Sequence, residues 1–204
     1  MVWKKIPLVM GCLLVASAAF AAEGEKAADA GKEPAYIGVA ACGKCHKSKK
    51  KGNQLGQWQS TEHAKAYAVL GDAEKVKKIT DALGIADAQK EAKCLACHAT
   101  AHGVPAEKIV APKPGKKGFL IEDGVQCEDC HGPGSLYKKN KVMKDHDASI
   151  AAGMIVPDEK TCAKCHSGTE NATLVEAGHK PFDKFNFEEA WPKVEHPRPE
   201  APAK

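Results

Sequence analysis

Four copies of the pattern C-x-x-C-H constrain this chain more than any other feature. They comprise Cys42, Cys45 and His46; Cys94, Cys97 and His98; Cys127, Cys130 and His131; and Cys162, Cys165 and His166. Two thiols at this spacing form thioether bonds to the edge of a haem, and the adjacent histidine binds the iron as its proximal ligand. Zinc knuckles need no histidine after each cysteine pair, and a thioredoxin-like site needs only one copy. Eight of the nine cysteines follow this pattern, which predicts four covalently attached c-type haems.

Residues 1–21 have the pattern of a secretory signal peptide. A short basic start precedes an apolar run over residues 6–16, and a small-x-small cleavage site follows at residues 19–21. Cys12 raises the alternative of a lipoprotein, but the apolar run continues past it, which favours its removal with the signal. No later segment reaches the length of a membrane span. We therefore expect the mature chain in the periplasm, with the outer surface or the extracellular space as alternatives.

The charge of the chain does not indicate a nucleic-acid partner. The formal net charge is +4, but it falls when the basic signal segment is removed, and the propionates of four haems lower it further. Lysines cluster at residues 47–51 and 113–117. They either balance the propionates from solvated loops or form docking patches for an acidic redox partner. The expected partners are redox proteins that donate and accept electrons.

The expected fold is mainly α, a compact multihaem cytochrome with short helices and long loops wrapped around four haems. Only 5% of the residues are aromatic, so the porphyrins supply much of the missing apolar core and the apoprotein should be largely unfolded. Residues 22–34 read as a flexible leader, residues 35–196 as the tetrahaem domain, and residues 197–204 as a disordered tail. The irregular spacing of the motifs argues against a tandem repeat.

Capping signals predict several short helices. They are expected from Ser60 or Thr61 to Leu70, from Asp72 to Leu83, from about Asp87 into Cys94, from Pro157-Asp158 through Cys165, and from Asn186 to Trp191 with Pro192 kinking or ending the last. Residues 103–126 are rich in Gly, Pro and Lys, which predicts a long loop with one short hairpin at most.

The ligand on the second side of each iron decides what a multihaem protein can do, because a second strong ligand limits the iron to electron transfer. Five histidines lie outside the motifs: His63, His102, His146, His179 and His196. Beyond the signal segment only Met143 and Met154 offer a thioether. Bis-histidine ligation is therefore favoured over His/Met ligation.

The chain resembles the tetrahaem cytochrome c554 family over most of residues 36 to 196. The segments that carry the resemblance are Tyr36-Ile37-Gly38, Trp58 with Glu62-His63-Ala64-Lys65-Ala66, Gly124 through Gly134, and Phe185-Asn186-Phe187-Glu188-Glu189 ahead of His196. The Cys-His-Gly-Pro-Gly segment with a downstream histidine is the most specific of them. The resemblance also implies haems packed in near-contact pairs, the first with the third and the second with the fourth.

The resemblance implies three distal ligands. In the family pattern His63 would lie opposite His131, His146 opposite His46, and His196 opposite His166. Each such bond would join distant parts of the chain and would cost stability if removed.

The second haem, held by His98, is where the sequence departs from the family pattern. In the best-known form of the family this haem is five-coordinate, with a small-residue–Pro–Phe segment over its open face. Pro181-Phe182 matches that segment, and the preceding His179 is placed where it could close the iron. His102, four residues after His98, lies on the proximal side. Its expected role is a propionate contact or a hydrogen bond to a ligand, with ligation in a neighbouring subunit as an alternative.

These residues predict an electron carrier more than an enzyme. One alternative is an oxidoreductase whose open second haem acts on a nitrogen oxide or a similar small ligand, which requires that His179 does not bind. The other alternative is a subunit of an extracellular cytochrome filament, which requires self-association and ligands shared between subunits.

Overall fold

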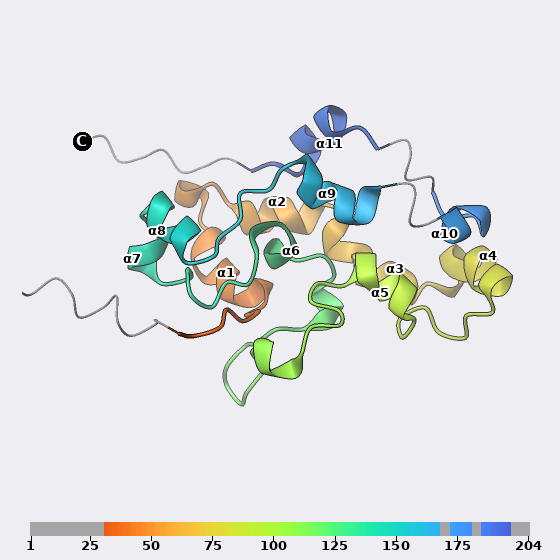
Figure 1. Ribbon diagram of the computed structural model, residues 1–204, viewed down its shortest axis with the longest axis horizontal. Helices are drawn as coiled ribbons and strands as arrows, with labels where there is room; N and C mark the ends of the chain where they lie inside the picture. The colour runs from red at the N-terminus through yellow and green to blue at the C-terminus, as the bar shows by residue number, and fades with distance from the viewer. Residues whose placement is uncertain (1–30, 168–171, 181–184, 197–204) are drawn as a thin grey trace, which may run out of the picture. The chain divides into compact units, whose positions relative to one another are not determined.

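The computed structural model describes residues 31–167, 172–180 and 185–196 (Figure 1). The chain divides into two units, Met1–Lys32 and Glu33–Lys204, and the elements below belong to the second. The expected signal segment with Cys12, most of the leader, Pro181-Phe182 and the tail lie outside the described residues.

Regular structure in the described part of the chain is helical, and the helices are short (Figure 1). The α-helices are α1 Val39–His46, α2 Gln54–Ser60, α3 Ala66–Leu70, α4 Ala73–Leu83, α5 Ala92–His98, α6 Cys127–His131, α7 Asn140–Met143, α8 His146–Ala151, α9 Glu159–His166, α10 Ala172–Glu176 and α11 Phe187–Val194. Four 3-10 turns accompany them: η1 Lys49–Lys51, η2 His63–Lys65, η3 Ala106–Lys108 and η4 Ile121–Asp123. The expectation of a mainly α fold with short helices is confirmed.

Side-chain caps begin the helices that the sequence predicted most clearly. The Asp72 carboxylate accepts a hydrogen bond from a backbone amide in the first turn of α4, which ends at Gly84 in the left-handed conformation. Asp158 caps α9 in the same way and forms a capping box with Thr161. Asn186 caps α11. Short polar side chains satisfy first-turn amides that have no partner within the helix, which explains why these starts could be predicted.

Other helix boundaries differ from the expectation. Helix α5 begins at Ala92, five residues later than expected, and runs to the end of the motif. Helix α3 begins only at Ala66, although it ends at Leu70 as predicted. Helix α2 was not predicted at all. Pro192 does not end α11, which continues to Val194. Proline removes only one amide donor, here the one that would bond to the Glu188 carbonyl, and the helix ends two residues later.

Residues 103–126 form the long loop that the composition indicated. Its pairing is limited to an antiparallel bridge between Lys113 and Lys116 and a parallel bridge between Tyr36 and Ile109. The Phe119 amide donates to the Val110 carbonyl at 2.8 Å, which closes the loop on itself. The loop therefore adds backbone pairing to the segment ahead of α1.

Each C-x-x-C-H motif lies at the end of a helix, and its histidine is the last helical residue. This holds for α1, α5, α6 and α9. Helix α1 packs against α6, and α5 packs against α9. The motifs are thus paired first with third and second with fourth, as the resemblance implied for the haems.

The apolar core of the described residues is small. Leu70, Ala88, Leu95 and Ala99 form its main cluster, with Cys94 of the second motif packed against it. Several of the most deeply buried side chains are polar: Thr100, Gln126, Glu128 and Ser149. No helix in the described ranges is long and apolar enough to cross a bilayer. Hydrogen bonds between distant segments therefore carry much of the organisation around the motifs.

Candidate haem-binding site

A buried glutamate inside the third motif joins it to the segment ahead of the first. The Glu128 side chain, only 2% exposed, accepts hydrogen bonds from the amides of Ile37 at 2.9 Å and of Gly38 at 2.8 Å. It also accepts from the amide of Gly134 in the Gly-Pro-Gly turn at 2.6 Å. Burial raises the pKa of Glu128, and these backbone bonds oppose the shift. One carboxylate thereby fixes three backbone segments around α6.

A second buried network connects the second and third motifs. The Gln126 side chain accepts from the Val39 amide at 2.7 Å, and its own backbone amide donates to the Thr100 hydroxyl at 2.7 Å. The Thr100 hydroxyl donates to the Asp129 carboxylate. Because Thr100 follows the second motif closely and Asp129 lies within the third, this network sets the position of α5 relative to α6.

The segment around Trp58 is bound to the chain just before the third motif. The Trp58 indole N–H donates to the Val125 carbonyl at 2.7 Å, and the Val125 amide donates to the His63 carbonyl at 3.1 Å. Gly124 adopts φ +73, and a Cβ there would lie 2.8 Å from the His63 carbonyl oxygen. Only glycine fits this close approach. Three of the segments that carry the family resemblance therefore meet around α6.

Three of the four motif histidines have Nδ1 within hydrogen-bond distance of an oxygen. The contacts are His46 to Gln54 Oε1 at 3.2 Å, His98 to the Ala66 carbonyl at 2.7 Å, and His131 to the Ile155 carbonyl at 3.0 Å. A carbonyl oxygen only accepts, so these bonds place the proton on Nδ1 and leave Nε2 available to a metal. Histidines that bind metals are commonly oriented in this way.

Histidines gather in pairs. The ring centroids are 6.1 Å apart for His63 and His166, 6.2 Å for His98 and His179, and 5.7 Å for His131 and His196. Two imidazoles on opposite sides of one iron would have centroids about 6 Å apart, because a metal–nitrogen bond is about 2 Å long and the nitrogen lies about 1 Å from the ring centre. The residues present therefore fit haem iron held between two histidines.

Two of these pairs differ from those implied by the resemblance. That pattern put His63 opposite His131 and His196 opposite His166, whereas the structure brings His63 to His166 and His196 to His131. His166 also stacks on Phe185 with the centroids 4.7 Å apart. His98 and His179 also lie near each other, and binding of the second iron by His179 stays a prediction. Short sequence matches identify candidate ligands, but the choice of partner depends on contacts between distant segments.

The remaining two candidate histidines have no ring partner among the described residues. His146, expected opposite His46, begins α8 and has its Nδ1 3.5 Å from the Asp147 carboxylate. His46 instead lies near enough to His131 and His196 to lower the pKa of both, although burial is the main cause. The pairing of His46 with His146 stays a prediction. His102 follows Ala101, a non-glycine residue at φ +57, and its role also stays open.

Burial keeps most of the candidate ligands in the form that binds metals. It lowers the pKa of five histidines: His63, His98, His131, His166 and His196. Removing an imidazolium from water is costly, so the neutral ring is favoured. Neutral imidazole is the form that binds iron, and these rings need not lose a proton to do so near neutral pH.

Cysteines of different motifs also meet. No disulfide joins any of the eight described cysteines. A hydrogen bond between Cys42 and Cys127 raises the pKa of Cys42 and lowers that of Cys127. The corresponding bond between Cys97 and Cys165 lowers the pKa of Cys97 to about 7 and raises that of Cys165. These contacts bring the attachment points of the first and third motifs together, and likewise those of the second and fourth.

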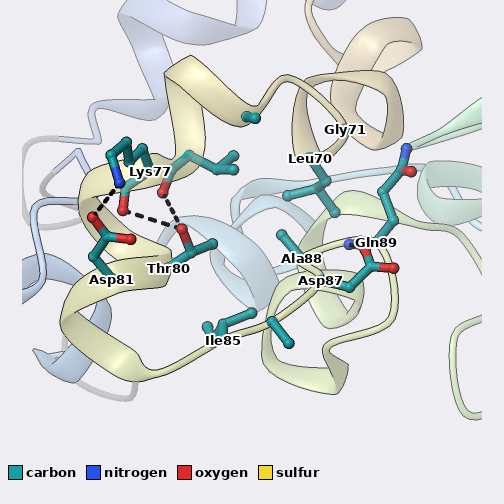
Figure 2. A pocket seen from close by; sticks show the side chains of 12 residues that line it. Leu70, Gly71, Lys77, Thr80, Asp81, Ile85, Asp87, Ala88 and Gln89 are labelled. Atoms are coloured by element: carbon teal, nitrogen blue, oxygen red, sulfur yellow. Dashed lines mark hydrogen bonds and ion pairs between the residues drawn. The ribbon is translucent and has the colours of Figure 1, made fainter.

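A pocket of about 480 Å³ lies beside the apolar cluster that packs on Cys94 (Figure 2). Its lining residues are Leu70, Gly71, Ala73, Val76, Lys77, Thr80, Asp81, Ile85, Ala86, Asp87, Ala88 and Gln89. Lys77 pairs with Asp81 at 2.8 Å at its rim (Figure 2). None of the lining residues is a histidine or a cysteine, so the pocket offers neither of the residue types that the haem motifs use.

Sequence reasoning missed the polar residues that organise the site. Glu128 and Gln126 lie within or beside the third motif, in the segment that most specifically carried the resemblance. The only feature of the sequence that could have indicated the role of Glu128 is its position as a charged residue inside a haem motif. Its partners at Ile37 and Gly38 lie about ninety positions away, so their contact could not be inferred from local pattern.

Two comparisons with known proteins agree with this site. The family model described as "Cytochrome c554 and c-prime" matches residues 41–132, which contain the first three motifs. Cytochrome c-554 of Nitrosomonas europaea is 29% identical over 197 residues, covering 86% of this chain and 76% of the relative. No solved structure gives a significant match. With the motifs that end α1, α5, α6 and α9, these matches show that the chain is similar to the cytochrome c554 family, and they support a c-type cytochrome that binds haem covalently and carries electrons.

Proposed function

We propose that the chain is a tetrahaem electron carrier of the periplasm, in which each iron is held between two histidines. The four C-x-x-C-H motifs support the number of haems, since each supplies two cysteines and a histidine at the end of a helix. The three histidine ring pairs support closed coordination. Redox proteins are the expected donors and acceptors.

We assign to each iron one histidine from its own C-x-x-C-H motif and one histidine from outside the motifs. The first iron takes His46 and His146, the second His98 and His179, the third His131 and His196, and the fourth His166 and His63. Three of these assignments follow the ring pairs. The first follows the family resemblance together with the fact that His146 is not used elsewhere.

The single observation that carries the proposal is the distance between His98 and His179. Their ring centroids are 6.2 Å apart, and the Nδ1 of His98 is bonded to the Ala66 carbonyl, which leaves its Nε2 available to a metal. Bound haem iron supplies a one-electron couple, and a second histidine leaves no position for a small ligand. The alternative of a nitrogen-oxide reaction at an open second haem requires His179 to stay off the iron.

The arrangement of the motif helices supports transfer within the chain. Helix α1 packs on α6 and α5 on α9, and Thr100 with Asp129 connects the second motif to the third. Haems attached at these positions would lie in a continuous set. Location in the periplasm rests on the signal-like residues 1–21, because cytochromes of this type receive their haem outside the cytoplasmic membrane. No observation in the described residues favours the filament alternative.

Low-temperature electron paramagnetic resonance of the oxidised holoprotein tests the proposal. We expect only low-spin signals that integrate to four haems per chain, one for each motif. The variant His179→Ala should convert one haem per chain to a high-spin signal, because the second iron loses its distal ligand while His98 remains.

The matched control is His102→Ala, which removes a histidine near the same motif and should leave all haems low-spin. A high-spin signal near one haem per chain in the unmodified protein would contradict closed coordination and would favour the small-ligand alternative. Haem content per chain, measured by pyridine haemochrome absorbance, tests the number of haems independently.

A further inference from the structure

Lysines surround the first haem motif, and the stretch of chain that carries them contains no acidic residue. Residues 35–61 hold five lysines and neither aspartate nor glutamate. The lysine patch, as we define it, consists of Lys44, Lys47, Lys49, Lys50 and Lys51, all exposed. The ion pairs of the described residues use other lysines: Lys65, Lys75, Lys77, Lys90 and Lys108. The positive charge of the patch is therefore not neutralised by its own segment.

The other three motifs have carboxylates at or beside them. Glu91 caps the helix of the second motif, Glu128 and Asp129 lie inside the third, and Asp158 with Glu159 begins the helix of the fourth. The first motif shares a lysine between its cysteines with the fourth, but only the first is followed by a run of lysines and has no acid nearby in sequence. Charge therefore distinguishes one haem site from the rest.

Exposure distinguishes the same site. Cys45 is the only exposed cysteine among the eight described, and the other seven are partly buried. An attachment cysteine marks where the edge of the haem meets the chain. That edge would reach the surface at Cys45, between Lys44 and Lys47. Electron transfer between proteins falls steeply with distance, so an exposed edge is where a partner must approach.

We propose that the lysine patch is the docking surface for an acidic redox protein that exchanges single electrons with the first haem site. The proposal rests on the electron-carrier function proposed above. A reduced partner would lose one electron to the haem iron that His46 would hold, which would pass from ferric to ferrous, and no bond to the chain would form or break. Positive charge around the contact steers an acidic partner into the correct orientation and raises the association rate.

A protein fits this surface better than a lipid membrane. Chains that bind anionic membranes commonly combine lysines with apolar side chains that enter the lipid. The exposed large apolar residues of the described chain all lie outside the patch segment: Val110, Leu120, Ile150, Ile155 and Val156. A charged surface without apolar anchors is typical of transient electron-transfer contacts, which are small and rich in steering charge.

Two variants of the holoprotein, each with three lysines changed to glutamate, separate an effect of the patch itself from an effect of the overall net charge. The patch variant is Lys49→Glu, Lys50→Glu, Lys51→Glu, and the control variant is Lys113→Glu, Lys116→Glu, Lys117→Glu. Both sets of lysines are exposed, and both variants change the net charge equally. The probe is a reduced plant-type ferredoxin, an acidic protein with a one-electron cluster. We expect the patch variant to lower the second-order rate in stopped flow about tenfold at low salt, and the control variant far less.

Lysine footprinting gives a readout that does not depend on electron transfer. Acetylation followed by mass spectrometry should show lysines of the patch protected by oxidised ferredoxin, with protection lost at high salt. Lys113, Lys116 and Lys117, the lysines changed in the control variant, should remain reactive toward acetylation. Equal slowing of both variants, or protection confined to another surface, would overturn the proposal. If the patch variant fails to acquire haem, the footprint of the unmodified protein still decides.

Further measurements separate the remaining outcomes. Sedimentation with phosphatidylserine vesicles tests whether the lysine patch binds an anionic membrane. If the patch binds vesicles but ferredoxin does not protect its lysines from acetylation, docking of a protein would be overturned. Cyclic voltammetry of the unmodified holoprotein tests the underlying function. If the voltammogram shows reversible waves but ferredoxin protects lysines outside the patch, only the docking surface is rejected. If the holoprotein shows no reversible reduction, the proposed electron-carrier function itself is rejected.

Discussion

At the scale of single residues, Glu128 shows how one side chain can position several parts of a haem protein. Its two carboxylate oxygens serve the amides of Ile37, Gly38 and Gly134, and the side chain is almost fully buried. A carboxylate can accept from several donors at once, whereas an amide offers a single oxygen and two additional N–H groups. The geometry of this site therefore requires an acid.

Glu128→Gln should destabilise the holoprotein by about 1–3 kcal/mol, because at least one buried backbone donor loses its acceptor. Guanidinium denaturation followed by far-UV circular dichroism measures the effect. The control is Glu122→Gln, which changes an exposed carboxylate a few residues ahead of the third motif. It should change the free energy of unfolding by less than about 0.5 kcal/mol. Equal stability of the two variants would show that the carboxylate has no such role.

At the scale of elements, the helices that present the motifs depend on their first turns. Helix α9 begins with a capping box, in which the Asp158 carboxylate accepts from the Thr161 amide at 2.9 Å and the Thr161 hydroxyl approaches the Asp158 amide at 3.2 Å. The cap fixes the first turn of an eight-residue helix whose last residue is His166. Helices this short are not stable alone, so the cap and the surrounding contacts hold the motif in shape.

Asp158→Ala should lower the thermal midpoint of the holoprotein by about 2–4 °C, because the first-turn amides lose their acceptor. The control Glu159→Ala removes an adjacent acid that makes no cap. Hydrogen bonds from Thr161 lower the pKa of Asp158 below its ordinary 3.8. The contribution of its charge is therefore present above that pH and is lost as the pH falls through the lowered pKa.

The pH dependence gives this prediction a second check. Asp158→Asn keeps an oxygen cap but has no titrating group, so its thermal midpoint should fall below that of the unmodified protein near neutral pH. The difference should shrink as the pH is lowered below about 4. A constant difference across that range would contradict the role of the ionised carboxylate.

At the scale of the whole molecule, the described chain has little apolar material to hold it together without haem. Only four of its ten buried apolar residues form the cluster around Leu70 and Leu95, and many of the organising contacts are polar. Binding energy of a cofactor is also folding energy where the site does not exist in the unfolded chain. Candidate iron ligands distributed along the chain from His46 to His196 would each add a crosslink.

Protein produced without haem attachment should therefore lack most of the helix signal of the holoprotein. Far-UV circular dichroism and limited proteolysis of the two forms provide the comparison. We expect rapid cleavage throughout the apoprotein, and cleavage of the holoprotein restricted to exposed loops. A cooperative thermal transition of the apoprotein with native helix content would show that haem is not required for folding.

The sequence predicted those features that depend on neighbouring residues. The C-x-x-C-H motifs, the caps at Asp72 and Asp158 and the glycine at the end of α4 are local patterns with local causes. The rings that meet His63 and His196 are those of His166 and His131, the reverse of the pairing that the resemblance implied, because such contacts depend on how separate segments pack. The role of Glu128 was missed for the same reason, since its partner Ile37 is 91 positions away.

The packing of α1 on α6 and of α5 on α9 also has a consequence for the order in which the chain is made. A chain is made from its N-terminus, and α1 and α5 precede their partners α6 and α9 along it. When the first two motifs have emerged, the acceptors for the Ile37 and Val39 amides have not. The early half therefore lacks these hydrogen-bond partners until the later half arrives. That delay leaves the first thiols open to the haem-attachment machinery before folding encloses them.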